Sequence, residues 1–309
     1  MLNEILSHHR SRRVLNFGLL MYSRLYADKE KKGSLSRPLW VLGMFRSGTS
    51  LLTNFYVNIG YNVGPNSRLL QSVGIWQDLN PKGFFEDFIF ADLSRYFLHL
   101  LGRSGDSPPT QAEVDGLNWA HFNVRDFISF SLINSFEDRI SIINKVRCYV
   151  FLIRYGLDGY ILSMGDMPIV KIPMLSFFYK LLASKWPLSR FVVIFRHPQS
   201  VLKSSQAITL RANEKLYCIY HEFLLDKYLE SKSAYYISYD HIIANPRESF
   251  FEICKKEGID KPMAEEKCIS LIDLSLIRNS EKTLIEDNRL SLLYYELCSR
   301  AINIFDKSQ

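Results

Sequence analysis

Gly-Met-Phe-Arg-Ser-Gly-Thr-Ser (residues 43–50) follows directly on the apolar stretch Trp-Val-Leu (residues 40–42). An apolar strand that runs into a loop bracketed by glycines, and then into a helix, is typical of a phosphate-binding loop. In that arrangement backbone N–H groups and the helix N-terminus point at an anion. The spacing matches the pattern G-x-x-x-x-G-K-[ST], except that Thr49 stands where a nucleoside triphosphatase has lysine. The only cation of the loop is Arg46, so we predict a phosphate-like ligand other than a magnesium-bound triphosphate.

The length and composition indicate a globular protein with a sizeable core. The chain has 309 residues, of which 47% are hydrophobic and 14% aromatic, which fits one large α/β domain or two small ones. The sequence shows no internal repeat, low-complexity tract or linker. We therefore predict an N-terminal arm (residues 1–37) followed by a single domain (residues 38–309).

The positive charge is concentrated in the N-terminal arm. Residues 1–37 contain eight Lys or Arg and three acidic residues, a net of +5 out of +6 for the whole chain. A nucleic-acid groove needs basic residues across the body of the fold, so no nucleic-acid partner is predicted. The apolar run at residues 14–22 is too short to span a bilayer and predicts an amphipathic helix. This arm either contacts an anionic membrane surface or is a solvated helix that keeps the protein soluble.

The five cysteines show neither a C-x-x-C pair nor a histidine at metal-binding spacing. Free thiols in a reducing compartment are the simplest interpretation. A cytoplasmic location is therefore predicted, peripheral to the inner face of the membrane if the arm binds lipid.

Apolar runs alternate with segments of helical periodicity, which predicts an α/β fold with a mostly parallel sheet of about four to five strands flanked by helices. Asn245, followed by Pro246, is a predicted helix start, with the asparagine as N-cap. Residues 92–165 are predicted to form a helical insert broken by a loop at 102–110, and the last forty or so residues are also predicted to be helical. The predicted strands are residues 38–42, 61–64, 168–172, 191–195 and 234–238, with a helix at 49–59.

A second motif, Arg-His-Pro-Gln-Ser-Val-Leu-Lys-Ser (residues 196–204), follows the predicted strand at 191–195. Arg196 is expected at the carboxyl end of that strand, where ligands bind in open α/β sheets. Arginine supplies a planar fork and Ser204 a hydroxyl, which together suit a phosphate monoester. The alternative is that Arg196 is a buried ion-pair residue and Ser204 a polar residue on a helix surface.

Together, the two motifs resemble those of the sulfotransferase family, in its bacterial carbohydrate-type branch. The resemblance covers about residues 38–257, because Tyr239-Asp240 and the helix start at Asn245 also match a segment typical of the family. It implies a three-layer fold like that of P-loop kinases and 3′-phosphoadenosine 5′-phosphosulfate as the sulfuryl donor, with adenosine 3′,5′-bisphosphate as the product.

The resemblance also implies roles for individual residues. Arg196 and Ser204 take the role of holding the 3′-phosphate. The residues that take the role of gripping the 5′-phosphosulfate are Arg46, Ser47, Gly48, Thr49 and Ser50. No metal is expected to be required, because a terminal sulfuryl group carries less negative charge than a phosphoryl group and the strand before Arg196 ends without a Mg²⁺-binding acid.

The segment Asn-Pro-Lys-Gly-Phe-Phe-Glu-Asp-Phe (residues 80–88) resembles a stretch of the bacterial carbohydrate-type enzymes in which a carboxylate acts as general base. Glu86 is the candidate, because its phenylalanine neighbours would desolvate it and raise its pKa. The alternative is a helix-terminal acid that is favoured by the helix dipole. Asp87 and His99 are further candidates for the base.

Lys171 matches the lysine of a K-D-P-R stretch seen in many bacterial members, although Ile172 and Met174 replace the Asp and Arg. It is a candidate for binding the acceptor or for steadying charge on the leaving oxygen. Alternatively it covers the sheet edge with its aliphatic stem.

The acceptor implied by the resemblance is a hydroxyl of a carbohydrate or glycolipid. The aromatic residues of the insert are expected either to stack on sugar rings or to form core; they are Tyr96, Phe97, Phe122, Phe127 and Phe130. The competing functions are a P-loop nucleotide kinase and a degenerate nucleotide-binding scaffold.

Overall fold

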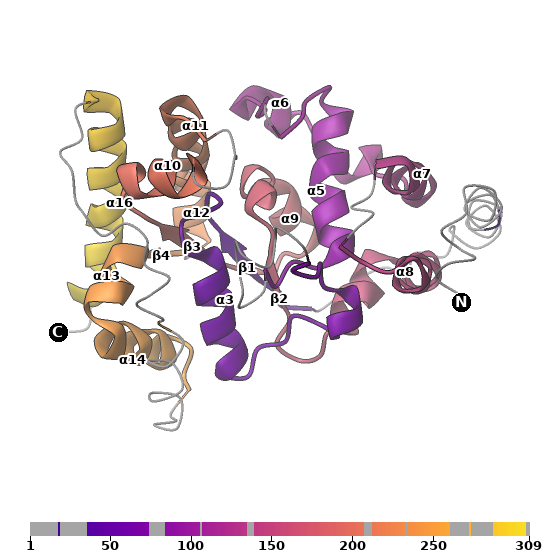
Figure 1. Ribbon diagram of the computed structural model, residues 1–309, viewed down its shortest axis with the longest axis horizontal. Helices are drawn as coiled ribbons and strands as arrows, with labels where there is room; N and C mark the ends of the chain where they lie inside the picture. The colour runs from indigo at the N-terminus through magenta and orange to yellow at the C-terminus, as the bar shows by residue number, and fades with distance from the viewer. Residues whose placement is uncertain are drawn as a thin grey trace. The chain divides into compact units, whose positions relative to one another are not determined.

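Four strands form the central sheet of this computed structural model, in the order β2-β1-β3-β4 (Figure 1). β3 pairs in parallel with both β1 and β4. β1 and β3 are apolar and almost wholly buried, as expected for parallel strands that are covered on both faces. The predicted α/β class with a parallel sheet flanked by helices is confirmed. The strands are β1 (Leu39–Leu42), β2 (Ile169–Lys171), β3 (Arg190–Phe195) and β4 (Tyr235–Ser238).

Part of the chain is described by the structure. The described residues are 18, 36–73, 84–105, 107–134, 139–206, 212–232, 234–259, 272 and 287–306. The predicted helix at residues 14–22 lies outside them apart from Gly18, as do residues 80–83 of the candidate base segment and most of the region between 260 and 286.

The chain divides into two compact units. The sheet unit comprises Leu39–Tyr61, Lys171–Tyr179 and Arg190–Gln309, and the helical unit comprises Met1–Pro38, Asn62–Val170 and Lys180–Ser189. The predicted helical insert falls within the helical unit. A single domain over residues 38–309 stays a prediction.

In the sheet unit, each of β1, β3 and β4 leads into a helix (Figure 1). Because these three strands are parallel, the loops and helix starts that follow them gather at one edge of the sheet. α16 packs against β4 and α11. The helices of this unit are α3 (Thr49–Asn58), η3 (Pro173–Phe177), α10 (Pro198–Gln206), α11 (Glu214–Leu224), α12 (Lys227–Ser231), α13 (Tyr239–Ala244), α14 (Pro246–Lys256) and α16 (Asn288–Asp306).

The amino ends of β3 and β4 are joined by a cluster around the buried side chain of Glu257. Arg190, the first residue of β3, donates to Glu257 Oε2 at 2.7 Å. Tyr235, the first residue of β4, donates to Oε1 at 2.5 Å, and Tyr61 also donates to this carboxylate. The cluster, here called the Glu257 cluster, fixes the end of the sheet opposite to the loops.

The helical unit confirms the helical character that was predicted for residues 92–165. α5 packs against α7, and α7 against α8. The main helices of this unit are α5 (Phe88–Leu100), α6 (Gln111–Asp115), α7 (Val124–Asn134) and α8 (Ile142–Leu162), with the short turns η1 (Asn66–Arg68) and η2 (Trp119–His121); α9 (Tyr179–Lys185) begins at the unit boundary.

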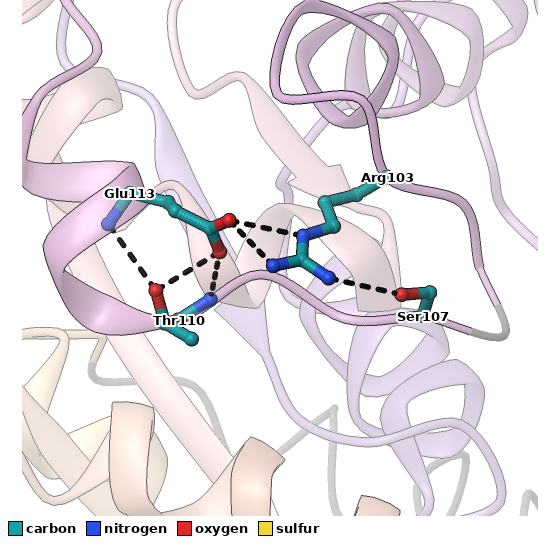
Figure 2. A network of polar contacts seen from close by, with 4 residues as sticks. All are labelled: Arg103, Ser107, Thr110 and Glu113. Carbon is teal, nitrogen blue, oxygen red and sulfur yellow. Dashed lines mark hydrogen bonds and ion pairs between the residues drawn. The ribbon is translucent and has the colours of Figure 1, made fainter.

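The predicted loop at residues 102–110 is present between two helices, and a network of polar contacts holds its ends together (Figure 2). Glu113 accepts from Thr110 N at 2.7 Å and from Arg103 Nε at 3.1 Å, and Arg103 also reaches Ser107 Oγ at 3.4 Å. Thr110 caps α6 in a capping box with Glu113. These hydrogen bonds, from Arg103 first, lower the pKa of Glu113 to about 2.

One local prediction is wrong, and another is confirmed in its position. Residues 61–64 are not a strand: Asn62 forms an isolated bridge with Pro168, and its side chain accepts from Gly64 N at 2.8 Å, so the backbone turns after one pair. Asn245 does occupy the N-cap of α14, with Pro246 at the first helical position, but its side chain makes no capping hydrogen bond.

Candidate functional site

The loop between β1 and α3 begins with a glycine that the fold requires. A Cβ atom on Gly43 would lie 2.5 Å from the carbonyl oxygen of Ile194 in β3, and the backbone has a φ of 157°. Gly43 N donates to Ser176 Oγ at 2.9 Å, and Ser176 Oγ is within 3.4 Å of Gly43 O. The close approach of β3 and the Ser176 contact therefore fix where the loop starts.

The centre of the loop contains two residues with a positive φ. Arg46 and Gly48 have positive φ values of 68° and 95°, and Ser47 N donates to Met44 O at 3.2 Å. No side chain caps the first turn of α3, which also contains no acidic residue. Turns of this kind, followed by a helix N-terminus, direct N–H groups at a negatively charged ligand.

Ser47 contributes a buried hydroxyl group to the loop. The residue is fully buried, and its Oγ has no hydrogen-bond partner among the described residues. An unsatisfied buried hydroxyl costs about 1–3 kcal/mol. A ligand oxygen in the loop is a natural partner for it.

The two sequence motifs meet directly. Arg46 Nε donates to Ser204 Oγ at 2.9 Å, across 158 positions in the sequence, and Arg196 Nη1 reaches Arg46 O at 3.5 Å. Arg196 and Ser204 are buried. The structure thus brings together Arg46, Arg196 and Ser204, all at the carboxyl edge of the sheet.

Three residues of this site had no role in the sequence-based prediction: Ser176, Tyr239 and Asp240. The guanidinium carbon of Arg196 lies 4.5 Å from the centre of the Tyr239 ring. Burial raises the pKa of Tyr239, while the positive charges of Arg196 and Arg46 act in the opposite direction. The sequence signals for Tyr239 and Asp240 are their match to a segment typical of the family and their position directly after a strand of the parallel sheet.

Glu86 belongs to the helical unit. It is half-buried, and its carbonyl oxygen accepts from Leu70 N at 2.8 Å. The guanidinium of Arg139 lies over the ring of Phe84, 4.5 Å from its centre. Burial lowers the pKa of Arg139, and the charge of Glu86 opposes this, so Arg139 lies close enough to Glu86 to feel its charge. The role of Glu86 as base stays a prediction.

Asp87, in contrast, is a helix cap. Its Oδ1 accepts from Ile89 N at 2.9 Å and Phe90 N at 3.3 Å, and Tyr160 donates to Oδ2 at 3.0 Å. Asp87 is 2% exposed. Burial raises its pKa from 3.8 to about 7, even though these hydrogen bonds and the charge of Arg68 act in the opposite direction. Oδ1 therefore caps the start of α5, and Oδ2 links this cap to Tyr160 of α8.

The raised pKa of Asp87 predicts a pH-dependent stability. A folded pKa above the unfolded value of 3.8 stabilises the fold at low pH, and this contribution is lost as pH rises through about 7. For a shift of this size the loss is at most about 4 kcal/mol. Between about pH 4 and pH 7, the unfolding free energy of the wild type from urea denaturation should therefore fall relative to that of Asp87→Asn. Buried His221, whose pKa is lowered to about 4, acts in the opposite direction in both proteins.

The matched control is Asp166→Asn, because Asp166 is exposed. This variant should keep the wild-type slope. Asp92, whose pKa burial raises to about 6, contributes equally to the wild type and to Asp87→Asn, so its contribution cancels from the difference between them. An unchanged slope in Asp87→Asn would rule out Asp87 as the source.

Lys171 ends β2 and is 2% exposed. β2 is an edge strand of the sheet described here, so an aliphatic stem that covers the sheet edge stays the alternative, although a buried ammonium group also requires polar partners. Its role toward an acceptor stays a prediction.

The aromatic residues of the insert mainly form core. Tyr96, Phe97 and Phe127 are at most 3% exposed, and the Tyr96 ring packs edge-on against Phe122 and Phe127. His99, the other candidate base, stacks on Phe130 with ring centres 4.9 Å apart. Burial therefore favours the core interpretation for the three buried rings.

The described residues contain neither a metal-binding cluster nor a helix suited to span a membrane. No group of three or more His, Cys, Asp or Glu in this part of the chain is arranged to hold a metal ion. None of the helices described combines the length and the apolar character that crossing a membrane requires.

Several solved structures are similar to this chain, at low sequence identity. The sulfotransferase domain from the Synechococcus PCC 7002 olefin synthase is 14% identical, with a TM-score of 0.45, over 89% of this chain and 97% of that domain. The sulfotransferase domain from the curacin biosynthetic pathway is 12% identical, with a TM-score of 0.43, over 86% and 99%. Sulfotransferase STF1 from Mycobacterium tuberculosis is 13% identical, with a TM-score of 0.37, over 93% and 82%. No family model and no curated protein match the chain. Likeness at this level carries no argument about function.

Proposed function

We propose that this protein is a sulfotransferase of the bacterial carbohydrate type. It moves a sulfuryl group from 3′-phosphoadenosine 5′-phosphosulfate to a hydroxyl of a carbohydrate or glycolipid. The observation that carries the proposal is the hydrogen bond of 2.9 Å between Arg46 of the loop and Ser204 of the second motif. This bond joins two anion-binding segments into one site, and the donor has two anionic groups, at its 5′ and 3′ positions.

In this proposal the loop holds the 5′-phosphosulfate. Its backbone N–H groups and the start of α3 face the anion, the buried hydroxyl of Ser47 gains a partner, and Thr49 and Ser50 bond the 5′-phosphate. Arg196 and Ser204 hold the 3′-phosphate, because a guanidinium fork and a hydroxyl suit a phosphate monoester. Arg46, in contact with Ser204, neutralises charge on the bridging oxygen.

The reaction is an in-line displacement at sulfur. The acceptor oxygen forms a bond to sulfur as the bond from sulfur to the bridging oxygen breaks, and adenosine 3′,5′-bisphosphate leaves with the electron pair. Glu86 takes the proton of the acceptor hydroxyl. Lys171 binds the acceptor or steadies the leaving oxygen. No metal ion is needed in this scheme, because arginine and backbone N–H groups carry the neutralisation.

The setting of the reaction follows from the sequence. We place the protein in the cytoplasm, since its cysteines suit a reducing compartment. The basic arm either contacts anionic lipid at the inner face of the membrane or keeps the protein soluble.

The direct test supplies the donor with radiolabelled sulfate to the purified chain together with panels of glycans and glycolipids. We expect label on at least one acceptor without added Mg²⁺. A Mg²⁺-dependent hydrolysis of ATP, with no transfer of sulfate, would favour a nucleotide kinase. Binding of adenosine 3′,5′-bisphosphate with no transfer to any acceptor class would favour a degenerate nucleotide-binding scaffold.

The 3′-phosphate assignment predicts selective loss in Arg196→Ala. Removing a charged hydrogen bond should weaken binding of adenosine 3′,5′-bisphosphate by about 1.5–3 kcal/mol, while the affinity for 5′-AMP changes little. Isothermal titration of both nucleotides measures this difference. The control is Arg247→Ala, an exposed arginine of α14. Equal losses for both nucleotides in Arg196→Ala would contradict the assignment.

A further inference from the structure

We propose that Tyr239 is a positioning residue that orients Arg196 and thereby sets the preference for nucleotides with a 3′-phosphate. The inference rests on the proposed function, and it assigns a task to a residue that the motifs leave without one. Two contacts of the Tyr239 ring and two hydrogen bonds to the backbone beside Arg196 carry it.

The Tyr239 ring touches both anion-binding segments. The guanidinium carbon of Arg196 lies 4.5 Å from the ring centre, within the range of a cation–π contact. A Cβ atom on Gly48 would lie only 2.2 Å from Cδ2 of Tyr239, so the ring also lies directly against the second glycine of the loop. One side chain therefore bridges the loop glycine and the arginine of the second motif.

The peptide bond between Arg196 and His197 is held by side chains at both of its polar groups. Tyr217 donates to the carbonyl oxygen of Arg196 at 2.9 Å. The N–H of His197 donates to Asp240 Oδ2 at 2.7 Å. The backbone is thus fixed by Tyr217 and Asp240, and the Tyr239 ring limits where the side chain of Arg196 can go.

An aromatic face is well suited to this task. It attracts a guanidinium group without supplying a carboxylate that would compete with a phosphate for the same N–H donors. Asp240 follows Tyr239 directly, and its Oδ2 accepts from His197 N and from Tyr294 at 3.4 Å. The start of α13 therefore orders the Arg196 segment through two neighbouring residues with different contacts. Because this segment is already ordered, the protein loses less conformational entropy when a ligand binds.

The test measures the ratio of the dissociation constants for 5′-AMP and adenosine 3′,5′-bisphosphate. Tyr239→Leu removes the aromatic face, and we expect the ratio to fall about threefold to thirtyfold, mainly through weaker bisphosphate binding. Tyr239→Phe retains the face and should stay within about twofold of wild type. Tyr295→Leu, at an exposed position of α16, is the matched control and should leave the ratio unchanged.

A double-mutant cycle separates positioning from a structural role. In an Arg196→Ala background, Tyr239→Leu should have no further effect on the ratio, because the group that it orients is gone. Equal weakening of both nucleotides by Tyr239→Leu, or an undiminished effect in the Arg196→Ala background, would overturn the inference. So would a loss in Tyr239→Phe as large as that in Tyr239→Leu.

The same experiment distinguishes a failure of the proposed function from a failure of the role of Tyr239 alone. If the wild-type protein shows no preference for the 3′-phosphorylated nucleotide, the 3′-phosphate site is wrong and the role of Tyr239 falls with it. If the wild type shows the preference and Tyr239→Leu retains it in full, only the role of Tyr239 is wrong.

Discussion

Replacing Glu86 by glutamine is expected to lower kcat about 10²- to 10⁴-fold, the usual contribution of general base catalysis. Glutamine keeps the size of the side chain but cannot accept the proton of the acceptor hydroxyl. The affinity for the donor nucleotide should hold, because the proposed nucleotide contacts all come from other residues. Initial rates at saturating donor, together with titration of adenosine 3′,5′-bisphosphate, measure the two quantities separately.

The neighbouring helix cap makes a stability control necessary for this experiment. Asp87 caps α5, and a disturbance transmitted from position 86 would lower the Tm along with the rate. Glu248→Gln, an exposed glutamate of α14, serves as the matched surface control. Normal turnover in Glu86→Gln would eliminate this residue as the base. A loss of turnover in His99→Asn would then identify His99 instead.

Replacing Gly43 by alanine is expected to destabilise the protein by about 2–4 kcal/mol, from backbone strain and overpacking together. The added methyl group would lie 2.5 Å from a carbonyl oxygen of β3, and a strand backbone cannot move aside cheaply. The loop would shift away from Ser176, and so nucleotide binding should weaken as well. Urea denaturation and nucleotide titration report the two effects.

Gly60 supplies a control with a positive φ and open space around it. Its φ is 111°, and a Cβ atom there would meet nothing within 4 Å. Gly60→Ala should therefore cost about 1 kcal/mol, from strain alone, with no change in nucleotide affinity. If the two variants lose equal stability, the close approach of β3 is not what requires glycine at position 43.

Much of the sheet could be predicted because its strands are continuous apolar runs. β1 and β3 are buried along nearly their whole length, and such segments have a clear signature in the sequence. The false strand at residues 61–64 had a similar but shorter pattern. There the side chain of Asn62 bonds to the backbone of Gly64, and this local turn prevailed over the apolar pattern.

The segments that form the site could be predicted from the sequence, but the contacts between these segments could not. The loop and Arg196 are visible as motifs, whereas the bond from Arg46 to Ser204 spans 158 positions and has no local signal. The pair Glu86 and Asp87 shows the same limit. The sequence favours Glu86 over Asp87 as the base but does not show what Asp87 does, and only the fold shows that Asp87 accepts the helix N–H groups.

The Glu257 cluster has a consequence for how this protein would respond to laboratory evolution. It ties Arg190, Tyr61 and Tyr235 together at the amino ends of the strands, away from the loops that follow their carboxyl ends. A variant library that keeps Gly43 and Gly48 and varies the other residues of the loops after β1, β3 and β4 leaves this anchor intact, so those variants should retain the sheet. Selection for an altered nucleotide preference should therefore enrich changes in those loops, while substitutions of Glu257 should be purged whatever ligand is selected.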